Sequence, residues 1–193
     1  MKQFIPSQQD HVLAVKRGLT IQRVISKRSV CHGELSIHGA LGEIAVKHIL
    51  GDDQWDFVDH KPDLYHADLK HRTTGVTVEV KTRCVKPSTM NPPRSSYSVH
   101  LARTSWKQRA DFFVFCYTNT SMSEVWILGC LPQKDKLRRG KFLRKGQQKG
   151  WMCHRDHMNI QIRDLNSLDK IYDHISKRRQ DDQSRKFHRH QWR

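Results

Sequence analysis

Asp68, Glu79 and Lys81 place two carboxylates and an ammonium group in one short segment, a combination that can hold a divalent cation beside a phosphate. Residues 76–81 alternate valines with polar residues, and this period of two predicts a half-buried strand. The valines of this strand are expected to face inward. The polar face then carries Glu79 and Lys81.

A turn at residues 73–75, Thr-Thr-Gly, is expected to fold the chain back as a β-hairpin, because glycine readily adopts turn conformations. In a hairpin centred on residues 73 and 74, Asp68 lies opposite Glu79 on the polar side. Leu69 then lies opposite Val78 on the apolar side, so the register agrees with the hydrophobic pattern.

Two carboxylates that face each other across strands repel, so this hairpin needs a nearby cation. Lys81 supplies one positive charge on the same face. Mg²⁺ (or Mn²⁺) is a better compensator, because it takes oxygen ligands and often uses only one or two carboxylates plus water and substrate phosphates. A lysine beside such a cation stabilises negative charge during phosphodiester hydrolysis. The alternative is a solvated strand face with an ordinary Glu79–Lys81 ion pair.

The pattern of Asp68, ten intervening residues and then Glu79-Val80-Lys81 resembles the PD-(D/E)XK nuclease superfamily, which has restriction-endonuclease-like and Holliday-junction-resolvase-like members. The proline that often precedes the aspartate is replaced by Ala67. Pro62-Asp63 is a literal match, but Asp63 cannot face Glu79 in the proposed register. The resemblance implies an α/β fold with a restriction-endonuclease-like core, a central mixed β-sheet flanked by helices, over about residues 35–132. It also implies metal ligation by Asp68, Glu79 and the carbonyl of Val80.

The resemblance adds further candidate site residues. In many members an acidic residue on the helix before the hairpin reaches the metal, and Glu43 holds that position; the alternative is an i,i+4 ion pair with Lys47. Gln108 matches a polar residue that some members place after the hairpin, although Ser105 and Gln108 also fit a helix capping box. Lys107 is a candidate phosphate contact.

The charge of the chain points to a polyanionic partner. Its 193 residues carry a formal net charge of +16, and residues 133–150 are especially basic. Nucleic acid is the favoured partner, with DNA preferred to RNA because the resembled family is mostly DNA-directed. The expected phosphate contacts in this run are Arg138, Arg139, Lys141, Arg144 and Lys145.

No partner other than nucleic acid is strongly indicated. The sequence has no apolar stretch of membrane-spanning length and no apolar signal-peptide core, so we expect an intracellular protein that does not act at a membrane. A cytoplasmic or nucleoid-associated location fits, or the host cytoplasm if the protein is viral. A homodimer is compatible with the resemblance. The main rival to a Mg²⁺-dependent nuclease is a non-catalytic nucleic-acid-binding protein with the same fold.

Hydrophobic periodicity places these residues in a single domain, residues 1–176, with a basic extension from 133 and a disordered basic tail at 177–193. A first helix is expected at 7–29, interrupted near Gly18, with Val12, Val15 and Leu19 on its apolar side. The other expected helices are 39–50, 104–111 and 167–178, and the expected strands are 56–58, 64–71, 75–83, 97–101, 111–117, 124–131 and 158–165.

Overall fold

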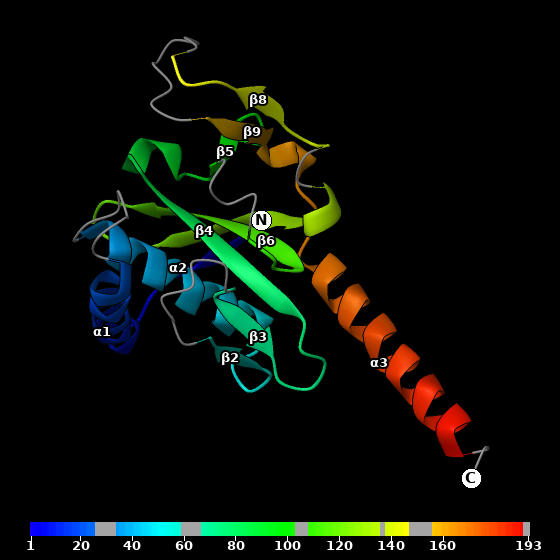
Figure 1. The fold of residues 1–193 in the computed structure, drawn as a ribbon. Coiled ribbons are helices and arrows are strands. Elements are labelled where there is room, and N and C mark those ends of the chain that lie inside the picture. The colour runs from blue at the N-terminus through cyan, green and yellow to red at the C-terminus, as the bar shows by residue number, and fades with distance from the viewer. Residues whose placement is uncertain (26–33, 59–66, 103–107, 136–137, 147–155, 191–193) are drawn as a thin grey trace.

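The computed structural model describes residues 1–25, 34–58, 67–102, 108–135, 138–146 and 156–190 (Figure 1). It shows an α/β protein in which a six-stranded mixed sheet packs against helices and a second, three-stranded antiparallel sheet lies beside it. The main sheet has the order β1-β7-β6-β4-β3-β2 and the small sheet the order β5-β9-β8. The strands are β1 (Lys2–Phe4), β2 (Trp55–Phe57), β3 (Leu69–His71), β4 (Thr77–Val85), β5 (Ser98–Ala102), β6 (Phe112–Asn119), β7 (Val125–Pro132), β8 (Lys141–Leu143) and β9 (His157–Gln161).

The β3–β4 hairpin has the predicted register. Leu69 pairs with Val78 and Lys70 with Thr77, which places Asp68 opposite Glu79. Gly75 closes the turn with a φ of +68°, a conformation that favours glycine. β4 also pairs in parallel with β6, which makes it a central strand covered on both faces.

The polar face of β4 is therefore not the solvated face expected from its alternating pattern. Glu79, Lys81 and Arg83 pair with Phe113, Phe115 and Tyr117 of β6, so all six lie on one face of the sheet. These aromatic residues form a buried cluster with apolar residues of β5 and β9. The second sheet covers this face, and a period-two pattern cannot reveal such a cover.

Helix α2 (Glu34–Leu50) covers the opposite face of β4, where the valines lie. Gly42 allows the helix to approach the sheet closely, since a Cβ atom there would lie 1.9 Å from Thr82 Oγ1. Gly39 has no such role, because a Cβ atom would meet nothing within 4 Å.

Helix α1 (Gln8–Ile25) runs without interruption through Gly18, and it buries a different side from the one predicted. Ala14 is fully buried, and a Cβ atom on Gly18 would lie 3.1 Å from the backbone of Ile37 in α2. Val12, Val15 and Leu19 are exposed. Ala14 and Gly18 face inward because small side chains let the backbones of α1 and α2 come close together.

Helix α3 (Asp169–His190) begins as predicted but continues through most of the stretch expected to be disordered. Its first turns dock on the core through buried Leu168, Ile171 and Ile175, and Arg178 pairs with Asp111 at 3.7 Å. The remaining turns project away from the body of the protein (Figure 1). Arginine, lysine and glutamine have high helix propensity, so a docked first half can propagate into an exposed second half.

The remaining elements depart from the sequence predictions in detail. β1 and β8 were not predicted, because three-residue strands carry little periodicity. The expected strand at 158–165 ends at Gln161 and is followed by a 3₁₀ turn, Ile162–Asp164. Residues 103–107 of the expected 104–111 helix lie outside the described residues, and residues 108–110 are not helical. In the part of the chain that is described, no helix is long and apolar enough to cross a membrane.

Candidate active site

Five of the predicted site residues converge at the edge where the β3–β4 hairpin meets α2 and the start of β6. Glu79 and Lys81 come from β4, Asp68 precedes β3, Glu43 lies on α2, and Gln108 precedes β6. The three carboxylates are buried, with Asp68 7%, Glu79 4% and Glu43 5% exposed. Elements far apart in sequence thus bring three acids into a site that water reaches poorly.

Asp68 is fixed by the backbone of the strand opposite. Its Oδ2 accepts a hydrogen bond of 2.7 Å from the backbone N–H of Val80. This bond ties the aspartate to the strand residue between Glu79 and Lys81. The predicted opposition of Asp68 and Glu79 is present in the strand register.

Glu79 is held by two donors on one oxygen. Its Oε1 accepts from Lys81 Nζ at 2.5 Å and from Gln108 Nε2 at 2.7 Å. Glu79 Oε2 and Gln108 Oε1 are buried and receive no hydrogen bond within the described structure. Buried oxygens are normally satisfied, so each of these acceptors could take a cation or a further donor. The ordinary Glu79–Lys81 ion pair exists, but it is buried in a site with other acids.

Glu43 contacts Arg17 and not Lys47, the partner that the alternative interpretation gave it. Arg17 Nε donates to Glu43 Oε2 at 2.5 Å, and its guanidinium stacks 4.1 Å from the ring centroid of Phe57. Lys47 instead donates to Asp52. Sequence reasoning missed Arg17, because it lies 26 residues before Glu43 and no spacing links the two.

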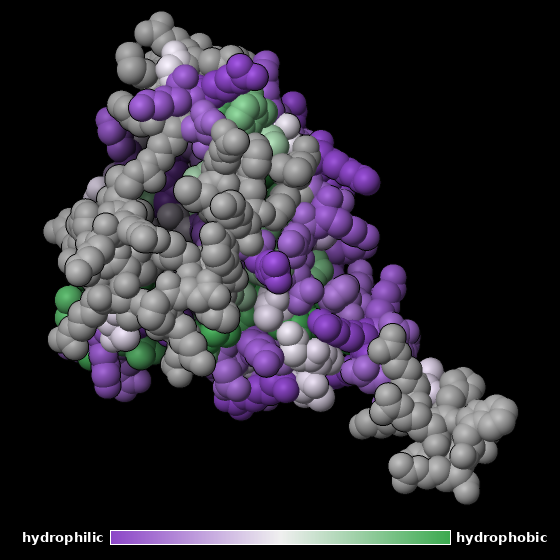
Figure 2. Space-filling model, in the orientation of Figure 1, coloured by the Kyte–Doolittle hydropathy of each residue, from purple (hydrophilic) through white to green (hydrophobic). Residues whose placement is uncertain are grey.

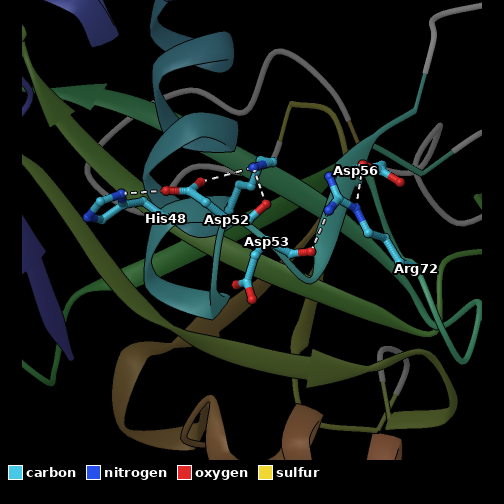
Figure 3. Close-up of polar contacts among 6 residues, drawn as sticks. His48, Asp52, Asp53, Asp56 and Arg72 are labelled. Carbon is cyan, nitrogen blue, oxygen red and sulfur yellow. Dashed lines mark hydrogen bonds and ion pairs between the residues drawn. The ribbon is translucent and has the colours of Figure 1, made fainter.

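Hydrogen bonds connect the turn after α2 with the β3–β4 hairpin (Figure 3). His48 Nδ1 lies 2.8 Å from Asp52 Oδ2 at the end of the helix. Arg72, just beyond β3, donates to the carbonyl of Asp53 at 2.6 Å and to the Asp56 carboxylate at 2.9 Å. These contacts fix the position of α2, and so of Glu43, relative to Asp68.

Burial and mutual repulsion raise the pKa of the site carboxyls. Burial raises the pKa of Asp68 to about 7, with a further rise from Glu43, while Lys81 opposes it. Burial likewise raises the pKa of Glu79 to about 7, with a further rise from Asp68. Burial also raises the pKa of Glu43 above its usual range despite the Arg17 ion pair. Full ionisation of all three acids is therefore unfavourable unless a further cation joins Lys81 and Arg17.

Lys81 remains a cation in this environment. Burial alone depresses its pKa, but the attraction of Glu79 and Asp68 outweighs burial and raises the pKa above its usual value. A permanently charged ammonium can stabilise developing negative charge and orient a water molecule. It is a poor proton acceptor.

The donor set fits Mg²⁺ or Mn²⁺. Among the described residues, no three His, Cys, Asp or Glu side chains are grouped closely enough to enclose an ion by themselves. Mg²⁺ does not need such a cage, because it typically takes one or two carboxylates and completes its shell with water and substrate phosphates. Asp68 and the unsatisfied oxygen of Glu79 meet that requirement.

The predicted nucleic-acid contacts divide into three groups. Lys107 lies outside the described residues. Arg139 is engaged internally, donating to the Asp164 carbonyl and Asn166 Oδ1. Exposed side chains occur at Arg138, Lys141, Arg144 and Lys145, on or beside edge strand β8 rather than in a plain loop. The coloured part of the surface in Figure 2, which belongs to the described residues, is largely hydrophilic, with hydrophobic side chains only in small groups.

The chain matches no family model, and comparison with curated proteins finds no match.

Proposed function

We propose that the protein is a Mg²⁺-dependent nuclease that hydrolyses phosphodiester bonds of nucleic acid, DNA more readily than RNA. The observation that carries this proposal is the buried convergence of Asp68, Glu79 and Lys81, with an oxygen of Glu79 left unsatisfied. A pure nucleic-acid-binding protein gains nothing from opposed carboxylates, which repel phosphate.

The chain order supports a restriction-endonuclease-like core. Helix α2, strand β2, hairpin β3–β4, strand β5 and strand β6, which is parallel to β4, follow in this order, and the acids lie where the hairpin meets the helix. The resemblance to the PD-(D/E)XK superfamily implies a helix, hairpin and parallel strand in this order; the further helix that it places at 104–111 falls largely outside the described residues, and 108–110 are not helical. The net charge of +16 supplies the attraction for a polyanion.

Each residue has a distinct role in this proposal. Asp68, Glu79 and the Val80 carbonyl would hold the cation, with Glu43 completing the shell directly or through water. The bound Mg²⁺ supplies Lewis acidity to a phosphate oxygen and lowers the pKa of its water. Lys81 orients the attacking water and stabilises the charge that develops on phosphorus oxygens. Gln108 keeps the Glu79 carboxylate in place.

A cleavage assay tests the proposal. Supercoiled plasmid, linear duplex and single-stranded DNA are incubated with Mg²⁺, Mn²⁺ or EDTA and the wild type, Glu79→Ala or Lys81→Ala. We expect metal-dependent cutting that falls at least about 100-fold in both variants while DNA binding persists. Matched controls are Asp173→Ala and Lys16→Ala, which remove an exposed acid and an exposed base from α3 and α1.

Two results would overturn the proposal. One is tight DNA binding with no cutting of these substrates, or of junctions, flaps and RNA, with either metal. That result favours a non-catalytic nucleic-acid-binding protein built on the same core. The other is cutting that persists in both site variants.

A further inference from the structure

A second feature lies on the same face of β4 as the candidate active site. A cleft of about 700 Å³ opens where the end of β4 meets β5 and β9, outside the group formed by Asp68, Glu79 and Glu43. Its volume is in the range of small-molecule and nucleotide sites. The side chains that give it chemical character are Arg83, Lys86, Tyr97, His100, Tyr117 and Asn159.

Arg83, the first residue of β4 that lines the cleft, lies two residues beyond Lys81 on the same strand. Residues two apart on a strand point to the same face and are separated by roughly 6.6 Å along it. Arg83 therefore follows Lys81 at a step comparable to the spacing of successive phosphates in an extended strand. A chain whose reacting phosphate lies at Lys81 would place its next phosphate at Arg83.

The charge of the cleft suits phosphate. Arg83 and Lys86 are exposed, and no acidic residue occurs among the described residues that line the cleft. Burial lowers the pKa of His100 to about 4, helped by the charge of Arg83 and by His157, so His100 is neutral near pH 7. The positive charge thus lies at the β4 side, and neutral groups line the rest.

The neutral part of the cleft suits a base. Asn159 lines this part of the cleft with a side chain that can donate and accept hydrogen bonds. Tyr97 supplies an aromatic ring at the wall, and aromatic rings stack on unpaired bases.

Tyr117 on the main sheet donates a 2.7 Å hydrogen bond to the Ser98 carbonyl of the second sheet, which joins the two walls of the cleft. A cleft of this volume can hold nucleotides of one chain, whereas a base-paired helix is much larger. We propose that this cleft binds the nucleotides beside the scissile phosphate as a single, unpaired strand. The proposal deepens the nuclease proposal and rests on it for the identity of the scissile phosphate.

A binding experiment tests the cleft without requiring catalysis. Fluorescence anisotropy is measured in Ca²⁺ with a labelled DNA strand of roughly 12 nucleotides and with the same strand in a blunt duplex. The variants are Arg83→Gln and Lys86→Gln, with Lys16→Gln on α1 as the control for loss of one charge. Far-UV circular dichroism confirms that each variant is folded.

We expect Arg83→Gln and Lys86→Gln each to raise the Kd for the single strand by about five- to tenfold, the loss of a charged hydrogen bond. In these two variants the Kd for the duplex should change less than about twofold. In Lys16→Gln the Kd for the single strand and the Kd for the duplex should both change less than about twofold. The proposal would be overturned if affinity for the single strand and for the duplex fell equally, or if neither variant lost more affinity than Lys16→Gln. If no substrate is cut but Arg83→Gln and Lys86→Gln lose affinity for the single strand alone, the nuclease proposal fails and the cleft is still a binding site for a single strand.

Discussion

Gln108 donates a 2.7 Å hydrogen bond to Glu79 Oε1, the same oxygen that accepts from Lys81. Both donors therefore approach one side of the carboxylate. The other oxygen, Oε2, is buried without a donor from the described residues. This asymmetry leaves one Glu79 oxygen without a hydrogen bond from the described residues, which suits the ligand role that we propose for it.

Replacing Gln108 by alanine should weaken the site without abolishing it. Glu79 loses one of its two donors but keeps Lys81, so we expect cleavage or Mn²⁺ affinity to fall about 10- to 100-fold, as for other groups that orient a metal ligand. Cleavage rates and Mn²⁺ titration measure the effect. The matched control is Gln3→Ala, which removes a similar amide–carboxylate bond to Glu124 on the surface. Equal rates for the wild type and Gln108→Ala would contradict the orienting role.

Stability in EDTA should fall as the pH rises. The Asp68 and Glu79 carboxyls have pKa values of about 7 in the fold, against ordinary values of 3.8 and 4.5. The folded protein therefore binds their protons more tightly than the unfolded chain. Their contribution to the free energy of unfolding is fully present below about pH 4 and is lost as the pH rises through about 7.

Thermal unfolding at several pH values, in EDTA and in Mg²⁺, measures this dependence. We expect Mg²⁺ to restore stability most strongly above about pH 7, where the acids are ionised and repel. Asp68→Asn removes one of the buried charges, so its stability in EDTA should depend less on pH. A wild-type curve in EDTA that rises between about pH 5 and 8 would argue against the raised pKa values.

Arg17 should be important for stability because it neutralises a buried acid. The side chains of Arg17 and Glu43 are 13% and 7% exposed, and Arg17→Met leaves Glu43 buried without its partner. We expect a loss of about 3–5 kcal/mol in the free energy of unfolding, measured by urea titration. The double variant Arg17→Met/Glu43→Gln should recover part of that loss.

The control for Arg17 is the exposed Arg72–Asp56 pair, whose side chains are 51% and 58% exposed. Arg72→Met should cost much less, since a solvated ion pair contributes little to stability and the remaining carboxylate stays hydrated. Similar losses in the two single variants would mean that the Arg17–Glu43 pair is not the source of the effect.

Gly42 and Gly39 offer a matched pair of substitutions on one helix. In Gly42→Ala the new methyl would lie 1.9 Å from Thr82 Oγ1, so Thr82 must move or α2 must shift and carry Glu43 with it. We expect a loss of about 1–3 kcal/mol and reduced cleavage. Gly39→Ala meets nothing within 4 Å, and a helical Gly→Ala change should stabilise by about 0.5–1 kcal/mol. Urea titration of both variants checks the contrast, and equal effects would contradict the close helix–sheet contact.

The hairpin and the central strands were predictable because their information is local. Alternating valines and the Thr-Thr-Gly turn determined the register that places Asp68 opposite Glu79. Continuous apolar runs predicted β6 and β7. The spacing of Leu168, Ile171 and Ile175 predicted the docked part of α3. Each signal lies within one or two neighbouring elements, where backbone geometry alone links position to side-chain direction.

The tertiary structure decided what those side chains meet. Periodicity shows that Glu79 and Lys81 share a face, but only packing shows that the second sheet covers that face. Arg17 reaches Glu43 from 26 residues away, and Ala14 and Gly18 rather than Val12 and Val15 face α2. These contacts depend on how closely separate elements can approach, a property of their combined shapes that no single segment of the sequence contains.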